Sequence, residues 1–247
     1  FRDRLMFPIR SIKGECIAFG GRLLSDKKDQ AKYLNSPETK LFNKSNELFG
    51  LFEAKDSKNT DTLIVVEGYM DVIGLYQHGI QNAVATLGTA VTSRHLSKLL
   101  RYTKDIYFAF DGDAAGKIAA WRALENLFPL MREDINAKFI FFDEGEDPDS
   151  YINKNGPNEF LKRVDKSMDI ESFIFNFLKR GRNLESSEDI RLIIFEFQKI
   201  YGSIKSDALK DTLLNQFSKS LDISKNSLIS KETKFKSTPK INPEQET

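Results

Sequence analysis

At the start of the chain, apolar and polar residues alternate in a manner typical of antiparallel strands. Leu5–Arg10 and Cys16–Leu24 are two such runs around a turn at Gly14, which predicts a β-hairpin. The stretch from Ser25 to Ser45 is polar and predicts a loop with little regular structure. Glu47–Ala54 then predicts a short helix. The first segment is therefore expected to combine strands and helix in one small unit.

After residue 60 the pattern changes, and short apolar runs rich in β-branched residues alternate with stretches of helical spacing. The predicted strands are Thr62–Val66, Ala83–Ala85, Ile106–Phe110 and Lys138–Phe142. The predicted helices between them are Met70–Gln77, Ser93–Tyr102, with Ser93 near its cap, and Ala114–Leu127. Regular alternation with short connections predicts a parallel α/β sheet with right-handed crossovers.

From about residue 157 onward only helical spacing is found, and a small helical bundle is predicted. Its helices are expected over Asn158–Val164, Ile170–Lys179, Glu188–Tyr201 and Asp207–Ser218. Past Lys231 the chain is polar and contains proline, which predicts a disordered linker. The expected organisation is a mixed α+β unit over 1–60, an α/β unit over 61–155, a helical unit over 156–230 and a linker over 231–247.

Composition narrows the class of protein. No apolar run of this 247-residue chain approaches the ~20 residues of a membrane-spanning helix. The chain begins at Phe1 with neither an initiator Met nor an apolar signal segment, so we expect a fragment of a longer, cytoplasmic protein. The single cysteine, Cys16, excludes an internal disulfide framework and fits a reducing compartment. With only His78 and His95 besides, no structural zinc site is expected here.

Charge is unevenly distributed, although the formal net charge is only +1. Residues 1–60 carry 12 Lys and Arg against 8 Asp and Glu, whereas residues 61–150 carry 8 against 14. A basic segment beside an acidic one suits a protein that binds phosphates and also holds cations. Chance variation among solvated surfaces explains the charge distribution, taken alone, at least as well.

Acidic residues follow three of the four predicted strands. In a parallel sheet the carboxyl ends of the strands share one edge, where ligands bind. The residues are Glu67 and Asp71 after the first strand, Asp111 and Asp113 after the third, and Asp147 and Asp149 after the fourth. Clustered carboxylates repel one another unless cations neutralise them, and their oxygens suit Mg²⁺ or Mn²⁺. The chemistry that such a site serves is phosphoryl transfer, with metals about 3.5–4 Å apart.

Two glycines next to these acids, Gly68 and Gly112, are expected to let the backbone turn sharply and to leave room for a phosphate. For any single acid the alternative is a helix N-cap or a solvated turn, and Asp113 directly precedes a predicted helix. Gly112–Ile118 resembles a nucleotide-binding P-loop, but it has too few residues between its glycines and an isoleucine where the loop needs Ser or Thr. We therefore set the P-loop aside.

The motifs that carry these acids resemble a known family. Val66-Glu67-Gly68-Tyr69-Met70-Asp71 and Phe110-Asp111-Gly112-Asp113 are similar to the Toprim domain of primases, topoisomerases and some nucleases. A more extensive resemblance, to bacterial DnaG-type primase, includes Phe1–Arg10, Phe19–Arg22, Lys32–Thr39 and Glu144–Asp149. It extends from residue 1 to about 155 and continues more weakly to about 225.

The resemblance implies roles for particular residues. The main metal-binding acids would be Glu67, Asp111 and Asp113, supported by Asp71, Asp147 and Asp149. Glu67 could be a ligand or a general acid/base. A basic ridge that meets template and nucleotide phosphates would consist of Arg2, Arg22, Lys32 and Lys44, with Asn35 near the groove. Tyr33 and Phe42 could stack on bases or pack beneath the loop.

It also implies an activity and partners. The chain would be the catalytic core of a primase that joins ribonucleoside triphosphates on single-stranded DNA, with two or more Mg²⁺ or Mn²⁺ ions and release of pyrophosphate. It would act as a monomer at the replication fork and meet the replicative helicase through a C-terminal domain outside these residues. The alternatives left open are a Toprim nuclease or topoisomerase that cuts DNA with the same acids, and a DNA-binding scaffold with a degenerate site.

Overall fold

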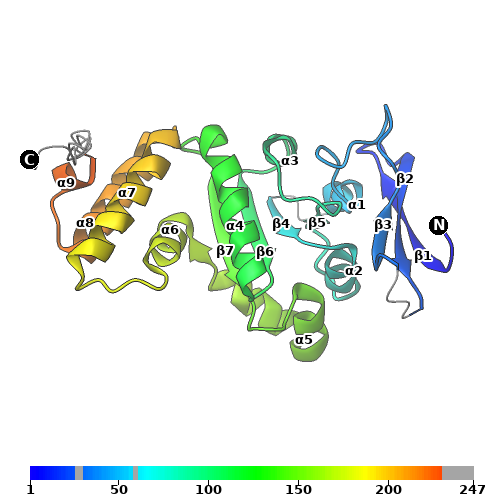
Figure 1. Ribbon diagram of the computed structural model, residues 1–247. Helices are drawn as coiled ribbons and strands as arrows, with labels where there is room; N and C mark the ends of the chain where they lie inside the picture. Colours follow the sequence, from blue (N-terminus) through cyan, green and yellow to red (C-terminus); the bar gives the residue numbers. More distant parts are fainter. Residues whose placement is uncertain (26–29, 58–60, 230–247) are drawn as a thin grey trace, which may run out of the picture.

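The computed structural model describes residues 1–25, 30–57 and 61–229 and begins with a small antiparallel sheet (Figure 1). Strands β1 (Arg4–Arg10) and β2 (Cys16–Leu23) form the expected hairpin, and β3 (Tyr33–Asn35) pairs with β2 on its other side. The expectation of a loop throughout 25–45 is therefore wrong at β3. This edge strand is only three residues long and forms through pairing with β2, so no local alternation marks it.

A second sheet has the strand order β5-β4-β6-β7-β8. Strands β4 (Thr62–Val66), β5 (Ala83–Ala85), β6 (Asp105–Phe110) and β7 (Asn136–Phe141) are parallel, as predicted. The edge strand β8 (Met168–Asp169) is antiparallel to β7, so the prediction that no strand follows residue 157 is wrong. Two residues leave no periodic pattern in a sequence.

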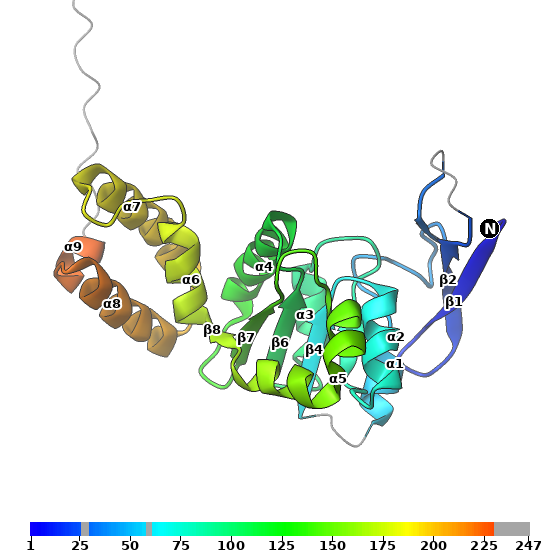
Figure 2. The ribbon, with the colours of Figure 1, turned by 90° about the horizontal axis from the view of Figure 1, so that it is seen from below.

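Helices cover both faces of this sheet (Figure 2). One face packs against α1 (Leu51–Asp56), α3 (Ser93–Leu99) and α4 (Ala114–Leu127), which is followed by the 3₁₀ turn η1 (Phe128–Leu130). The other face packs against α2 (Tyr69–Gln77) and α5 (Pro148–Asp165). Burial on both faces explains why the strands lack polar alternation.

Helix α5 begins ten residues earlier than predicted, at Pro148 instead of Asn158. Asp147 and Ser150 form a capping box at its start, with proline in the first turn. Gly156, at φ 81° and ψ 169°, and Pro157 interrupt it, so two helical pieces meet at a kink. The predicted helix corresponds to the second piece.

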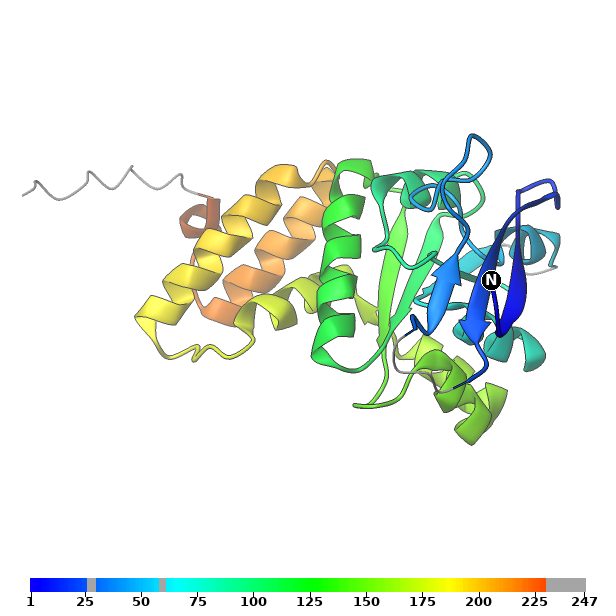
Figure 3. The same cartoon turned by 45° about the vertical axis from the view of Figure 1, so that its right-hand side comes forward.

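The chain then continues into α6 (Ile170–Lys179), α7 (Ser187–Ser203), α8 (Asp207–Leu221) and α9 (Lys225–Ile229). These helices share a core with the sheet through α6. The Phe177 ring of α6 stacks on Trp121 of α4 at 4.0 Å, and its Phe173 ring stacks on Phe139 of β7 at 4.2 Å. The N-terminal sheet and helices α7 and α8 lie at opposite ends of the molecule (Figure 3). The predicted linker, 231–247, lies outside the described residues.

The N-terminal sheet packs against the beginning of α2. Phe7 of β1 stacks on Tyr69 at 5.4 Å, and Phe49 meets the same ring edge-on at 4.7 Å. Ile9, Phe42 and other apolar residues complete this small core. The contact places β2 and β3 near the carboxyl ends of the parallel strands. Within the described part of the chain, no helix is long and apolar enough to cross a membrane.

Candidate functional site

The carboxyl ends of β4, β6 and β7 bring the predicted acids together at one edge of the parallel sheet. Asp111 lies at the centre of this group, and its backbone N–H donates to Glu67 Oε1 at 3.4 Å. The pKa of Asp111 is raised to about 6, first by burial and then by the negative charges of Glu67, Asp147 and Asp113, in that order. Mutual repulsion between carboxylates of several strand ends shows that they share one electrostatic environment. We call the six residues Glu67, Asp71, Asp111, Asp113, Asp147 and Asp149 the acidic edge.

Asp71 is the most buried member of the acidic edge, with 7% of its surface exposed. Its Oδ2 accepts a hydrogen bond from the Gly68 backbone N–H at 2.9 Å across the first turn of α2. Burial raises the pKa of Asp71 to about 7, with Asp147 as the next cause. Asp71 therefore has both a local role in starting α2 and a charge directed toward the other acids.

Two further members cap helices, as the alternative interpretation allowed. Asp113 Oδ1 accepts from the Gly116 N–H at 2.7 Å at the start of α4, and Asp147 Oδ1 accepts from the Ser150 N–H at 2.7 Å at the start of α5. Each of these bonds occupies one carboxylate oxygen and fixes the side chain at the sheet edge. Capping and cation binding are compatible here, because a carboxylate has two oxygens.

Asp149 belongs to the first turn of α5 and packs against α2. A Cβ placed on Gly74 would lie 2.1 Å from Asp149 Oδ1, so α2 needs glycine where Asp149 approaches. Burial raises the pKa of Asp149, the charge of Asp147 raises it further, and Arg22 of β2 lowers it. Arg22 of the basic ridge thus lies close enough to the acidic edge for its charge to act on Asp149.

Gly112 is required because neighbouring backbone fills the space beside it. The expectation that this space would be left for a phosphate is wrong. A Cβ at Gly112 would lie 1.9 Å from the Phe142 carbonyl oxygen and 2.7 Å from the Asp143 carbonyl carbon. The space beside it is therefore filled by the backbone that follows β7. This close approach brings the loop that contains Asp111 and Asp113 against the loop that leads to Asp147.

The acidic edge fits a divalent cation by the nature and charge of its donors. Carboxylate oxygens suit Mg²⁺ and Mn²⁺, and a cation would relieve the repulsion that raises the pKa of Asp111. In residues 1–25, 30–57 and 61–229, however, no three acidic, histidine or cysteine side chains converge closely enough to enclose a metal as they stand. Side chains of the acidic edge would have to rearrange for three of them to share one ion.

The basic residues on β2 and near β3 surround Tyr33, which is 38% exposed. The Arg22 guanidinium and the Lys32 ammonium each lie 5.9 Å from the centre of its ring. Burial raises the pKa of the Tyr33 hydroxyl, Arg22 lowers it, and Asp71 is among the acids that raise it. Tyr33 therefore stands between the basic ridge and the acidic edge. Phe42, the other candidate for base stacking, is fully buried and packs in the core instead.

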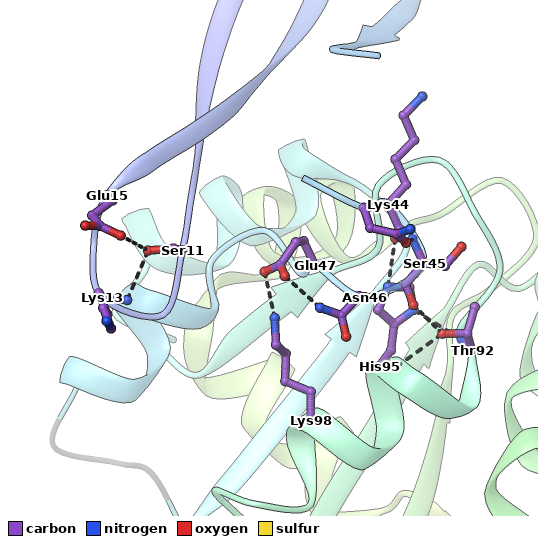
Figure 4. Close-up of polar contacts among 11 residues, drawn as sticks. Ser11, Lys13, Glu15, Lys44, Ser45, Asn46, Glu47, Thr92, His95 and Lys98 are labelled. Atoms are coloured by element: carbon purple, nitrogen blue, oxygen red, sulfur yellow. Dashed lines mark hydrogen bonds and ion pairs between the residues drawn. The ribbon is translucent and has the colours of Figure 1, made fainter. Parts of the chain in front are cut away.

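The remaining predicted residues are placed differently. Asn35 uses its amide internally, since Nδ2 donates to the Leu87 carbonyl at 2.8 Å and Oδ1 accepts from the buried Tyr69 hydroxyl. Arg2 is exposed just before β1. Lys44 lies in the turn before α1, and its side chain extends away from α3 (Figure 4).

Several residues near this edge were not anticipated from the sequence. The prediction considered three strand ends and omitted β5, whose following loop reaches Asn35 through Leu87. The N-cap of α3 is Thr92, directly before Ser93, which was expected near the cap, and His95 completes a capping box with Thr92. The spacing of Thr92 and His95 matches the S/T-x-x-E/Q capping box, but histidine replaces the usual acid or amide.

Comparison with known proteins gives matches along most of the chain. Residues 1–55 match the family "DNA primase catalytic core, N-terminal domain", and residues 61–141 match the Toprim domain. A DNA primase of Pseudomonas putida is 52% identical over 180 residues, which are 72% of this chain and 27% of that protein. A DNA primase of Legionella pneumophila is 45% identical over 220 residues, or 89% of this chain and 38% of that protein. The chain thus spans well under half the length of the curated relatives it matches.

Solved structures give a similar result. A DNA primase domain from Pseudomonas aeruginosa superposes with a TM-score of 0.86 at 42% identity, covering 92% of this chain and 71% of that one. The primase catalytic core of E. coli gives 0.84 at 40% identity, covering 90% and 71%. A DnaG primase catalytic domain bound to single-stranded DNA gives 0.82 at 39% identity, covering 89% and 70%.

Proposed function

Since the chain belongs to the DnaG family of DNA primases, we propose that it forms the catalytic core of an enzyme that makes RNA primers on single-stranded DNA. The reaction would be nucleotidyl transfer: the 3′-hydroxyl of the growing RNA attacks the α-phosphate of a ribonucleoside triphosphate, and pyrophosphate leaves. The observation that supports the proposal is the acidic edge, with Arg22 close enough for its charge to act on Asp149.

On this proposal, Glu67, Asp111 and Asp113 hold Mg²⁺ or Mn²⁺, and Asp71, Asp147 and Asp149 support them. Bound divalent metal supplies Lewis-acid stabilisation of the charge that develops on the reacting phosphate. Burial raises the pKa of Glu67, and the hydrogen bond from the Asp111 N–H, a smaller effect, lowers it. A half-buried carboxylate of this kind can bind a cation or accept the proton of the attacking hydroxyl.

The basic ridge would bind phosphates. Arg22 and Lys32 lie beside an exposed aromatic ring, an arrangement that suits a nucleotide whose base stacks while its phosphates meet cations. Lys44 would contribute a further phosphate contact without base preference. Arg2 would extend the ridge, whereas Asn35 would keep the ridge in register with the loop after β5.

The partners proposed are a single-stranded DNA template and ribonucleoside triphosphates. A family member has been solved with single-stranded DNA, which supports the first of them. Contact with the replicative helicase would use a domain outside these residues, and the enzyme would work as a monomer in the bacterial cytoplasm. A Toprim nuclease or topoisomerase is not favoured, because residues 1–55 match a domain of the primase catalytic core.

Primer synthesis tests the proposal. The protein is incubated with single-stranded DNA, ribonucleoside triphosphates and Mg²⁺ or Mn²⁺, and labelled RNA is resolved on a gel. Asp111→Asn should abolish metal-dependent RNA, while Asp143→Asn, an exposed acid of a neighbouring loop, should leave it unchanged. End-labelled DNA in the same reaction distinguishes the nuclease alternative. Cleavage of the DNA without RNA synthesis would contradict the primase proposal.

A further inference from the structure

The turn that contains Lys44 is bound to α3 by a row of polar contacts (Figure 4). Thr92 Oγ1 donates to the Ser45 carbonyl at 2.7 Å, His95 Nε2 contacts the Lys44 carbonyl at 2.9 Å, and Lys98 Nζ pairs with Glu47 Oε2 at 2.6 Å. Thr92, His95 and Lys98 are spaced three apart and so lie on one side of the short helix. These three contacts hold the turn against α3.

His95 is fixed at both ring nitrogens. Its Nδ1 accepts from the Thr92 backbone N–H at 3.1 Å, and the backbone N–H of His95 donates to Thr92 Oγ1 at 3.2 Å. Because Nδ1 accepts, the proton of a neutral ring is on Nε2, which therefore donates to the Lys44 carbonyl. Burial of this fully enclosed ring lowers its pKa, in keeping with the neutral form.

The backbone of Lys44 is immobilised while its side chain stays available. Phe42 and Leu48, on either side of the turn, are buried in two different cores. The Lys44 N–H also donates to Glu38 Oε1 at 3.1 Å, so both backbone groups of Lys44 are engaged. The ammonium group points away from α3 (Figure 4).

We propose that His95 is a positioning residue for Lys44: it fixes the lysine backbone so that the ammonium group meets a nucleic-acid or triphosphate phosphate from a preorganised turn. The inference rests on the proposed role of Lys44 in phosphate binding. Thr92 and Lys98 bind the neighbours of Lys44, whereas His95 binds the carbonyl of Lys44 itself. Preorganisation increases affinity because less conformational freedom is lost on binding.

Two substitutions separate the two bonds of His95. Asparagine can place an acceptor where Nδ1 lies but cannot reach the Lys44 carbonyl, whereas glutamine can place an amide N–H near the position of Nε2. His95→Asn should therefore weaken binding of single-stranded DNA about three- to tenfold. His95→Gln should restore most of it. A residue that only stabilises the fold would not show this preference for one donor position.

A double-mutant cycle with Lys44→Ala completes the test. Affinity for a fluorescein-labelled oligonucleotide of single-stranded DNA is measured by anisotropy at low salt for wild type, each single variant and both combinations, with circular dichroism to verify folding. His95→Asn should have no further effect once Lys44 is alanine. An equal loss in both backgrounds would overturn the proposal while the role of Lys44 stands.

The other outcomes are also decisive. If Lys44→Ala leaves affinity unchanged, the proposed phosphate contact fails and the positioning role fails with it. If His95→Asn does not fold, His95→Gln carries the test, and it should keep most of the wild-type affinity. A folded His95→Gln that binds as weakly as Lys44→Ala would overturn the proposal.

Discussion

Replacement of Gly112 by alanine should separate two loops of the acidic edge. The added Cβ would lie 1.9 Å from the Phe142 carbonyl oxygen, whereas ordinary contacts of a Cβ begin near 3.4 Å. The obstacle is backbone, so no side-chain rotation can relieve the clash. The loop after β6 and the loop after β7 must therefore move apart by about 1.5 Å.

The cost of this movement can be bounded. Overpacking in a tightly packed region costs about 1–3 kcal/mol, and a backbone clash of this depth belongs at the upper end. For a chain of this size, 3 kcal/mol corresponds to a fall in Tm of about 6–12 °C. The displacement also moves Asp111 and Asp113 away from Asp147, so affinity for Mn²⁺ should fall as well.

Thermal and urea unfolding of Gly112→Ala measure the loss of stability. Gly202→Ala is the matched control, because Gly202 lies near the end of α7 with open space around its added Cβ. Alanine there should be neutral or stabilising by up to about 1 kcal/mol. A free energy of unfolding for Gly112→Ala within 0.5 kcal/mol of wild type, roughly the limit for a harmless surface change, would refute the reasoning.

Three further results are expected. The double substitution of Lys32 and Lys44 by alanine should weaken binding of single-stranded DNA and lower the slope of log affinity against log salt by about two units, while binding of Mn²⁺ survives. If the salt curves of the double variant and wild type coincide, the basic ridge is only surface charge. Because burial and Asp147 raise the pKa of Asp71 to about 7, the stability that this residue contributes below its ordinary pKa is lost as pH rises toward 7. Asp71→Asn should therefore show a shallower decline in the free energy of unfolding between about pH 4 and 7, and an unchanged decline would count against that shift. A chain ending at Asn155 should lose stability, because α6 no longer covers the sheet, yet a folded preparation should still bind Mn²⁺, as calorimetry can show.

Elements with strong local patterns were predictable from the sequence. The bounds of Thr62–Val66, Ala83–Ala85, Ala114–Leu127 and Ile170–Lys179 agree with the structure. A short apolar run such as Thr62–Val66, rich in β-branched residues, favours a buried strand, and an aspartate directly before each of the two helices marks its start. Local chemistry and tertiary packing favour the same structure at these positions.

Elements that depend on distant partners were not predictable. Strands β3 and β8 exist because β2 and β7 offer edges to pair with, and their few residues show no period of their own. The start of α5 was missed for another reason: its acidic residues suggested a ligand loop, although Asp147-Pro148 followed by Ser150 is also a capping sequence. One residue can serve both purposes.

At the candidate site, the sequence predicted which acids gather at one edge of the sheet, but not which contacts they make. Strand order placed Glu67, Asp111 and Asp147 at one edge, since parallel strands end together. The packing of Gly112 depends on a backbone thirty residues further along, and no pattern around Gly112 itself reveals that neighbour. The contact of His95 with the turn of Lys44 is likewise set by the tertiary fold.

Binding of Mn²⁺ by the acidic edge is the most direct test of the central claim. The ion is titrated into the protein and into Asp111→Asn, with Asp143→Asn as a control of equal charge change, and binding is measured by electron paramagnetic resonance or calorimetry. Asp111 lies at the centre of the repulsion between carboxylates, so its neutral replacement should reduce affinity at least about tenfold while the control keeps it. Equal affinity of Asp111→Asn and wild type would contradict the assignment of the acidic edge as the metal site.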